Sequence, residues 1–314
     1  MKRKFILFAF LGLCIMTFGA FALYWWGTSE RSYLEDAVHS TTYLHTVVNR
    51  ETSMTNVGSG TAFYLNFIDD RDPTNEVVCL VTNRHNVQPY TGPYYVFWTS
   101  ETFDGKPNYG ESERIKLEAG ASDWIYPADD EIDLALLPIN GFIDEYKKAR
   151  RFGPYIKPFQ EWQIPTQEEW ENFRSMMVVS TIGYPRGYYD TINNIPLVLT
   201  GHTAGLPSLS FRDTEEFLVN VTNAHQSSGS PILDDKLVNE RSFFGRYYGS
   251  EPKLLGVHWA TPKRWLLQSD VETTSPELPS SQIAIRQYLD IGLAERSYHL
   301  LELKQQVFLR TVDH

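Results

Sequence analysis

Three residue types that together perform nucleophilic catalysis occur in this chain in the order His, Asp, Ser. His85 follows one apolar run, Asp133 opens another, and Ser228 lies in a small, hydroxyl-rich turn before a third. A serine hydroxyl is a poor nucleophile until a positioned imidazole takes its proton, and a buried carboxylate holds that imidazole in one tautomer. Each residue alone has an ordinary interpretation as a surface histidine, a strand-entry cap or a loop residue. Their joint occurrence at the ends of predicted strands favours a Ser/His/Asp triad for acyl transfer.

The elements that would position these residues are predicted to be mainly short β-strands. Apolar runs between Gly, Pro and Asn turns predict strands over 43–48, 57–65, 77–82, 94–98, 132–138, 178–182, 197–199, 217–221, 232–233 and 254–259. A capping box predicts a helix over 166–176, and a second helix is expected over 295–307. The segment 141–163 and the stretch that follows Trp98 are expected to be irregular. Many short strands with few helices indicate an all-β body.

Six short motifs lie where the candidate residues and their strands occur. They are G-S-G-T-A-F at 58–63, V-T-N-R-H-N-V at 81–87, D-L-A-L at 133–136, G-Y-P at 183–185, S-G-S-P at 228–231 and G-V-H-W-A at 256–260. Together they resemble the motifs of trypsin-like serine proteases of the chymotrypsin fold, in particular bacterial trypsin-like peptidase domains. The resemblance covers roughly residues 43–260. It implies two perpendicular six-stranded Greek-key β-barrels with the site between them.

The resemblance also implies a role for each candidate residue. Ser228 would be the nucleophile, His85 the general base and then acid, and Asp133 the residue that orients the imidazole. The backbone N–H groups of Gln226 and Ser228 would form the oxyanion hole. Gln226 stands where the family has glycine, and the loss of one such donor can lower the rate by about 10²–10³-fold. Either Gln226 tolerates that backbone conformation, or the enzyme is weak or needs a partner to order its site.

Other acidic residues compete with Asp133 for the orienting role. Asp129, Asp130 and Glu131 precede it directly in the sequence. Only Asp133 lies immediately before the apolar strand, so we assign the role to Asp133 and interpret the cluster as a solvated loop.

The primary substrate pocket is assigned to Thr222 and to His258, Trp259 and Ala260. Thr222 lies six positions before the candidate nucleophile and is not an acid, so a preference for Arg or Lys is not supported. His258 could bind an acidic or polar substrate side chain, or it could be a hydrogen-bonded structural histidine.

The N-terminal segment has the pattern of a membrane signal anchor. Lys2-Arg3-Lys4 precedes an uninterrupted apolar stretch over residues 5–26, which as a helix would be about 33 Å long and could cross a bilayer. The positive-inside rule places the body on the extracytoplasmic side, with the aromatic residues 24–26 at the far interface. Cleavage after the small-x-small pattern at 20–22 would instead release a secreted protein. We favour the uncleaved anchor because the apolar stretch continues past that pattern.

The bulk properties exclude several other classes of protein. The chain has 314 residues, 28 basic and 39 acidic, for a net charge of −11, and such an acidic body without a basic stripe is a poor nucleic-acid partner. Its two cysteines, Cys14 and Cys79, lie in apolar runs, so no disulfide framework is expected. No residues at metal-ligand spacing occur, and no metal or cofactor is inferred.

These observations lead to one main hypothesis and two alternatives. The main one is a membrane-tethered, exported serine endopeptidase that hydrolyses polypeptides through an acyl-enzyme. The first alternative, motivated by Gln226, is a proteolytically silent peptide-binding module with the same fold. The second is an esterase, although the Gly-x-Ser-x-Gly elbow of that class does not occur around Ser228. The expected domains are the signal anchor (1–28), a first barrel (29–145), a second barrel (146–275) and a helical tail (276–314).

Overall fold

The computed structural model describes most of the chain between Tyr33 and Thr311. The described residues are 33–50, 53–88, 90, 92–212, 214–221, 228–234, 252–260, 263–266, 285–288 and 291–311. The predicted signal anchor at 1–28 and the site residues Thr222 and Gln226 lie outside these ranges. Among the described residues, no helix is long and apolar enough to span a membrane.

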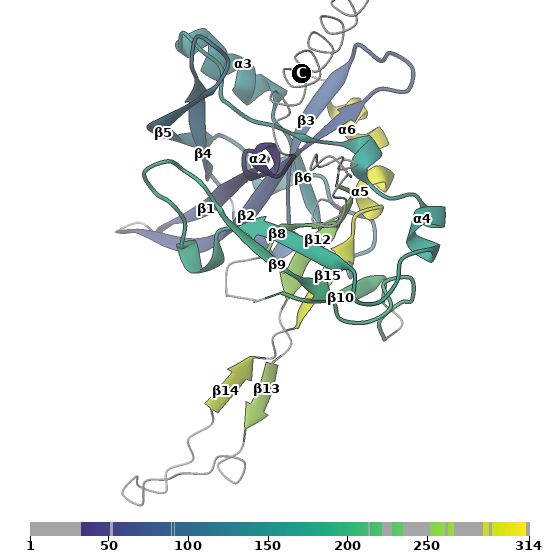
Figure 1. Ribbon diagram of the computed structural model, residues 1–314. Coiled ribbons are helices and arrows are strands. Elements are labelled where there is room, and N and C mark those ends of the chain that lie inside the picture. Colours follow the sequence, from purple (N-terminus) through teal and green to yellow (C-terminus); the bar gives the residue numbers. More distant parts are fainter. Residues whose placement is uncertain are drawn as a thin grey trace, which may run out of the picture.

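The first half of the described chain builds a seven-stranded sheet (Figure 1). After the short helix α2 (Tyr33–Val38), its strands are β1 (Thr41–Arg50), β2 (Ser53–Ile68), β3 (Glu76–Thr82), β4 (Tyr94–Glu101), β5 (Pro107–Leu117), β6 (Ala135–Pro138) and β7 (Phe159–Gln160). Their order is β5-β4-β1-β2-β3-β6, and β7 pairs with β2 in parallel. The 3₁₀ helices η1 (Arg84–Asn86), η2 (Ala121–Asp123) and η3 (Glu161–Gln163) and helix α3 (Asn140–Ala149) lie in its connections.

The second half forms a closed six-stranded antiparallel barrel. Its strands are β8 (Val178–Gly183), β9 (Leu197–Thr203), β10 (Glu216–Asn220), β11 (Pro231–Asp234), β12 (Leu254–Ala260) and β15 (Gly292–Arg296), in the order β10-β15-β12-β11-β8-β9. Helix α4 (Gln167–Glu171) precedes β8, and the 3₁₀ helix η4 (Pro185–Gly187) follows it. Strands β13 (Lys263–Leu266) and β14 (Ile285–Tyr288) pair only with each other, and helices α5 (His299–Glu302) and α6 (Lys304–Thr311) end the described chain.

The predicted fold class is confirmed in part. The chain is mostly β, with one closed six-stranded barrel and a second sheet. The expectation of two closed barrels is not met in the pairings of the first sheet, whose end strands β5 and β6 do not pair with each other. Strand β6 is only four residues long and ends at Pro138, and proline has no N–H with which to extend a ladder.

Three elements differ from those that the sequence predicted. Helix α3 occupies the start of the segment 141–163, where Ile143 and Tyr146 are buried on one face. Strand β5 occupies the stretch that was expected to be loop. Strand β15 overlaps the start of the helix expected at 295–307, because its backbone completes the barrel between β10 and β12.

The capping box of α4 is present, since Thr166 Oγ1 accepts from the Glu169 N–H and Glu169 Oε2 accepts from the Thr166 N–H. The domain boundaries stay a prediction.

A shared hydrophobic core joins the two halves of the molecule. One cluster of buried side chains combines Phe63 and Val81 from the first sheet with Ile182 and Val257 from the barrel, and with Val307 from α6. Burial of such side chains contributes about 1.5–3 kcal/mol each. The elements that carry the candidate residues therefore rest on one continuous core.

The C-terminal helix α6 is tied to the first half by charged groups. Lys304 Nζ lies 2.6 Å from Asp70 Oδ1 and 3.0 Å from Glu161 Oε2. Arg310 Nη1 donates to the carbonyl oxygens of Ser122 and Asp123 at 3.0 and 2.9 Å. The residues after the barrel are thus part of the packed body.

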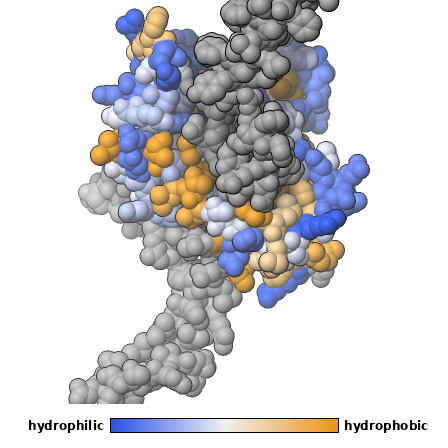
Figure 2. Space-filling view, viewed as in Figure 1, coloured by the Kyte–Doolittle hydropathy of each residue, from blue (hydrophilic) through white to orange (hydrophobic). Residues whose placement is uncertain are grey.

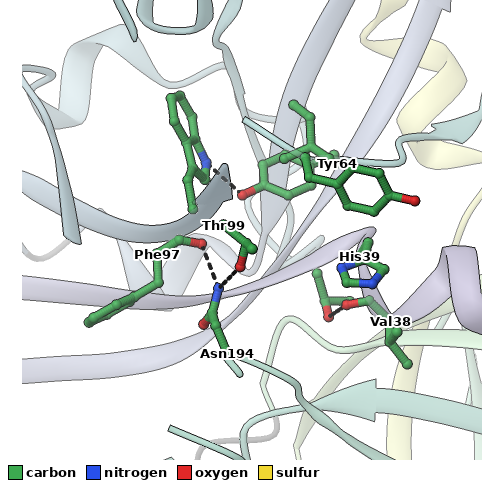
Figure 3. A pocket seen from close by; sticks show the side chains of 10 residues that line it. Val38, His39, Tyr64, Phe97, Thr99 and Asn194 are labelled. Atoms are coloured by element: carbon green, nitrogen blue, oxygen red, sulfur yellow. Dashed lines mark hydrogen bonds between the residues drawn. The ribbon is translucent and has the colours of Figure 1, made fainter. Parts of the chain in front are cut away.

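A small polar cavity lies between the first sheet and the connection that precedes β9. Its volume is about 10 Å³, the size of a single water molecule. Asn194 reaches into it and donates from Nδ2 to the carbonyl oxygen of Phe97 at 3.2 Å, beside Thr99 (Figure 3). None of the candidate catalytic residues His85, Asp133 and Ser228 lines this cavity.

The surface is predominantly hydrophilic on the face shown in Figure 2, with orange groups gathered near the middle of the described part. Large apolar side chains that are exposed in the described chain include Phe103, Met176, Ile192, Leu206 and Leu209. Single exposed apolar residues of this kind are normal on soluble domains and need no functional explanation.

Candidate active site

His85 is presented by a short 3₁₀ turn at the end of a buried strand. Strand β3 ends at Thr82, and Asn83 and Arg84 turn the chain into η1. Asn83 is fully buried, and its Nδ2 donates to the carbonyl oxygen of Asp133 at 2.7 Å. The side chain of His85 itself is 47% exposed. The turn therefore fixes the backbone of His85 and leaves its ring accessible.

His85 and Asp133 form a two-point contact. His85 Nδ1 lies 2.5 Å from Asp133 Oδ2, and the His85 backbone N–H donates to Asp133 Oδ1 at 2.9 Å. The carboxylate faces Nδ1, so the neutral ring carries its hydrogen on Nδ1 and presents Nε2 as a base. The Asp133 side chain is only 16% exposed. This arrangement can hold an imidazole in the tautomer that accepts a proton from a nucleophile.

The neighbouring acids are used elsewhere. Asp130 Oδ1 lies 2.6 Å from Nη1 of Arg84, whose guanidinium also donates to the Pro127 carbonyl oxygen at 2.7 Å. Asp129 Oδ1 accepts the backbone N–H of Glu131 at 3.0 Å and so closes a local turn. The acid in contact with His85 is therefore Asp133.

Ser228 is bonded through its backbone carbonyl to Thr61 and to Asn86, the residue that follows His85. The Thr61 N–H donates to the carbonyl oxygen of Ser228 at 2.9 Å, and Asn86 Nδ2 donates to the same oxygen at 3.2 Å. Asn86 follows His85 directly and is buried. A side chain at Gly60 would collide with Asn86, since a Cβ there would lie 2.6 Å from Asn86 Nδ2. The motifs around Gly60, His85 and Ser228 therefore pack against one another.

The turn after Ser228 requires glycine. Gly229 has φ +89°, and a Cβ at this position would lie 1.9 Å from the Thr61 carbonyl oxygen. Its N–H donates to the carbonyl oxygen of His258 at 2.8 Å. Since L-residues with a Cβ rarely adopt this conformation and the space is filled, the glycine of the S-G-S-P pattern is a geometric requirement of this packing.

The strand assigned to the substrate pocket lies next to the serine turn. The His258 N–H donates to the Ser230 carbonyl oxygen at 2.9 Å, and Ser228 Oγ donates to the Trp259 carbonyl oxygen at 3.0 Å. His258 is 4% exposed, and Ala260 ends strand β12. The structure thus places Asp133 against His85, and it places Ser228 against β12 and against Asn86, the residue that follows His85. Thr222 and Gln226 lie outside the described residues, and the pocket and oxyanion hole stay predictions.

The sequence analysis missed three residues that organise this site. Asn83 and Asn86 lie directly before and after the dipeptide Arg84-His85, and each donates its amide to the backbone of another candidate residue. Their place within the V-T-N-R-H-N-V motif was the available signal. Glu295 Oε1 accepts the N–H of Asp133 at 3.1 Å from the barrel, and no local sequence pattern indicates that contact.

An imidazole in contact with a carboxylate can perform acid–base chemistry, as His85 and Asp133 could here. The hydroxyl of Ser228 is bonded to the Trp259 carbonyl oxygen. Within the described part of the chain, no group of three or more His, Cys, Asp or Glu side chains could hold a metal ion.

Comparisons with known proteins give structural similarities only. No family model and no curated protein matches the sequence. An inactive serine-to-alanine mutant of Rv3671c from M. tuberculosis H37Rv is 12% identical, with 90% of this chain and 93% of that chain covered and a TM-score of 0.42. Catalytically active tobacco etch virus protease in complex with product is 11% identical, with coverage of 89% and 82% and a TM-score of 0.38. A cysteine-to-alanine mutant of that protease is 11% identical, with coverage of 87% and 81% and a TM-score of 0.41. TM-scores below 0.5 assign neither a family nor an activity to this chain.

Proposed function

We propose that the protein is a serine endopeptidase that cleaves polypeptides through an acyl-enzyme on Ser228. The observation that carries the proposal is the contact between His85 Nδ1 and Asp133 Oδ2 at 2.5 Å. It is supported by the bond from Asn86, the residue that follows His85, to the Ser228 carbonyl oxygen. This pairing leaves His85 Nε2 as the proton acceptor for a nucleophile.

In the proposed reaction, Ser228 Oγ attacks the carbonyl carbon of the scissile bond and His85 Nε2 takes the hydroxyl proton. His85 then gives that proton to the departing amine, which leaves an ester on Ser228. Water attacks the ester with His85 again as base, and the acid product leaves as Ser228 regains its proton. Before attack the hydroxyl must exchange the Trp259 carbonyl oxygen for His85 Nε2, which requires rotation about χ1.

The described thiol does not compete for the role of nucleophile. Cys79 is fully buried in the core cluster of the first sheet, and burial raises the pKa of its thiol. A thiol acts as a nucleophile through its thiolate, which such burial disfavours. This supports serine rather than cysteine chemistry at the site.

A second candidate function is a peptide-binding module without peptidase activity. Two observations favour it. Gln226 occupies the position at which trypsin-like serine proteases have glycine. The Ser228 hydroxyl donates to the Trp259 carbonyl oxygen rather than to His85. Under this alternative, peptide affinity would not depend on the Ser228 hydroxyl.

Covalent labelling separates these functions. A fluorophosphonate probe should modify the purified body at Ser228, and both Ser228→Ala and His85→Ala should abolish labelling while the circular dichroism spectrum is retained. Labelling that survives Ser228→Ala, or its absence from folded wild-type protein, would rule out the peptidase. Peptide binding that is unchanged in Ser228→Ala would then support the binding module.

We further propose that residues 5–26 anchor the protein in a membrane with its body on the extracytoplasmic side. The proposal is supported by the uninterrupted apolar stretch after three basic residues. A reporter enzyme fused after His314 should be active only outside the cytoplasm and should sediment with membranes after alkaline washing. A soluble cytoplasmic fusion would exclude the anchor, and a soluble exported one would favour cleavage.

A further inference from the structure

Glu295 is a buried acid that contacts the candidate catalytic residues from the opposite half of the molecule. It lies on β15 and is 2% exposed. Its Oε1 accepts the backbone N–H of Asp133 at 3.1 Å. Asn83 holds the carbonyl oxygen of Asp133 from the other side. The backbone of Asp133 is therefore fixed between its own sheet and the barrel.

This contact links the two parts of the site through paired strands. Glu295 pairs with Val257 on β12. The backbone of the next residue, His258, is hydrogen-bonded to Gly229 and Ser230 in the turn after Ser228. Glu295 thus connects the strand next to Ser228 with the acid that contacts His85. Displacement of Glu295 would change the distance between the two halves of the site.

Among the residues that the structure describes, the charges that act on Glu295 are acidic. Glu216 lies directly opposite it on β10, and Asp129 and Asp133 approach from the segment before β6. Strand β12 contributes only the apolar Val257 at the paired position. Burial, with smaller contributions from these acids, raises the pKa of Glu295 to about 7, although the Asp133 N–H opposes the shift.

The nearest cation in the sequence is engaged elsewhere. Arg296 Nη1 lies 3.2 Å from Glu215 Oε2, and its Nη2 donates to the Pro207 carbonyl oxygen at 3.0 Å. Glu295 is therefore not neutralised by its neighbour in the chain.

We propose that Glu295 is a positioning residue that holds Asp133 in register with His85 and Ser228 across the two halves of the molecule, and that its ionisation modulates this site. The inference rests on the proposed peptidase function. When Glu295 is neutral, it accepts the Asp133 N–H without placing a second charge beside that carboxylate. When it is ionised, two carboxylates repel each other across a buried contact. The position of Asp133, and hence turnover, changes as Glu295 loses its proton.

Two substitutions separate the acceptor from the charge. Glu295→Gln keeps an oxygen for the Asp133 N–H but cannot ionise, whereas Glu295→Ala removes both properties. Glu216→Gln is the matched control, because Glu216 lies opposite on the same face without a hydrogen bond to Asp133. Each variant is compared with the wild type by its circular dichroism spectrum and by kcat and KM against a peptide substrate.

We expect Glu295→Ala to lower kcat about 10–100-fold with little change in KM, as misplaced catalytic groups do. Glu295→Gln should retain kcat near that of the protonated enzyme and lose an ionisation near pH 7 from the profile of kcat. Glu216→Gln should leave kcat nearly unchanged and keep that ionisation, moved towards lower pH because the Glu216 charge contributes to the raised pKa of Glu295. Equal kcat values in the Ala and Gln variants, or an unchanged profile in the Gln variant, would overturn the proposal.

A readout that does not require turnover separates this inference from the proposed function. The hydrogen-bonded proton between His85 and Asp133 can be followed by proton NMR and assigned by its loss in His85→Ala. It should shift with pH around 7 in the wild type and in Glu216→Gln, and the part of this shift that Glu295 causes should be missing in Glu295→Gln. If fluorophosphonate does not label the wild type, the peptidase proposal fails, yet this titration still decides whether Glu295 controls the pair. A resonance with the same pH dependence in Glu295→Gln would refute the coupling even if Glu295→Ala does not fold.

Discussion

Asn86 and Ser228 connect the two halves of the candidate site, since Asn86 Nδ2 donates to the Ser228 carbonyl oxygen at 3.2 Å. The same amide lies 3.1 Å from Thr82 Oγ1, which donates to the Thr61 carbonyl oxygen at 2.8 Å. Thr61 in turn donates its N–H to Ser228. The serine backbone is therefore positioned by polar groups of the sheet that carries His85.

The first prediction concerns Asn86. Asn86→Ala should lower kcat about 10–100-fold, because Ser228 would shift relative to His85. The free energy of unfolding should fall by only about 1 kcal/mol, since the Ser228 carbonyl oxygen keeps its bond from Thr61. Steady-state kinetics on a peptide substrate and urea unfolding provide the two measurements.

Asn140→Ala is the matched control for this prediction. Asn140 Nδ2 donates to the Glu76 carbonyl oxygen at 2.9 Å, and its Oδ1 accepts the Val78 N–H at 2.8 Å. It therefore loses comparable bonds at the opposite end of β3. A loss of kcat in Asn140→Ala as large as in Asn86→Ala would show that the effect is general destabilisation.

The second prediction concerns the glycine after the candidate nucleophile. Gly229→Ala should destabilise the protein by more than the roughly 1–2 kcal/mol expected for an L-residue at positive φ. The excess arises because the new Cβ would lie 1.9 Å from the Thr61 carbonyl oxygen. Labelling of Ser228 should be lost in any folded fraction. Thermal unfolding and probe labelling measure both effects.

Gly105→Ala tests the cause of this effect. Gly105 also has a positive φ, +70°, but no heavy atom lies within 4 Å of the Cβ built there. It should show only the backbone cost and full labelling. If Gly105→Ala and Gly229→Ala were equally destabilised, the collision with Thr61 would have no role.

The third prediction distinguishes Asp133 from the nearby acids. Asp133→Asn should lower kcat about 10⁴-fold, because an amide at this position favours the wrong imidazole tautomer. Asp130→Asn should leave kcat nearly unchanged, since Asp130 is 93% exposed and pairs with Arg84. The side chain of Arg84 is only 8% exposed, but the substituted amide keeps an oxygen that can accept from it, so the free energy of unfolding should change by only about 1 kcal/mol. A larger loss of kcat in Asp130→Asn than in Asp133→Asn would show that Asp130, and not Asp133, orients the imidazole.

The sequence predicted those parts of the site that lie within short motifs. The contact of Asp133 with His85 could be anticipated, because each residue adjoins an apolar strand and two such strands, β3 and β6, pair in the sheet. The S-G-S-P turn was also recognisable from its glycine. In both cases the residues that the site requires lie within a short sequence motif.

Other features could not be predicted because their cause is not local. Strand β15 contains Glu295 and Arg296 within five residues, a pattern typical of an exposed helix, yet both side chains are buried by contacts from distant segments. Glu295 meets Asp133 from 162 positions away in the sequence. Strand β5 has mostly exposed residues and lies at the edge of its sheet, so no apolar alternation marks it.

The fourth prediction follows from the buried carboxyl of Glu295. Its pKa is raised from an ordinary value of 4.5 to about 7 by burial first and by Glu216, Asp133 and Asp129 second, against the opposing effect of the Asp133 N–H. The folded protein therefore binds this proton more tightly than the unfolded chain does. Its contribution to the free energy of unfolding is fully present below about pH 4.5 and is lost as the pH rises through about 7. At about 1.4 kcal/mol per pKa unit, the loss amounts to about 3 kcal/mol.

Urea unfolding of the wild type and of Glu295→Gln between pH 5 and 8 measures this contribution. The upper limit lies about one pH unit above the pKa of about 7 expected for Glu295 in the folded protein. Other titrating groups contribute to both curves, so the difference between the two proteins isolates Glu295. The wild type should lose stability relative to Glu295→Gln as the pH rises towards 7, and the difference should then level off. If the free energies of unfolding of the two proteins changed in parallel with pH, Glu295 would be ionised in the folded protein well below neutral pH. Its carboxylate would then have to be stabilised beside Asp133 rather than neutralised by a proton.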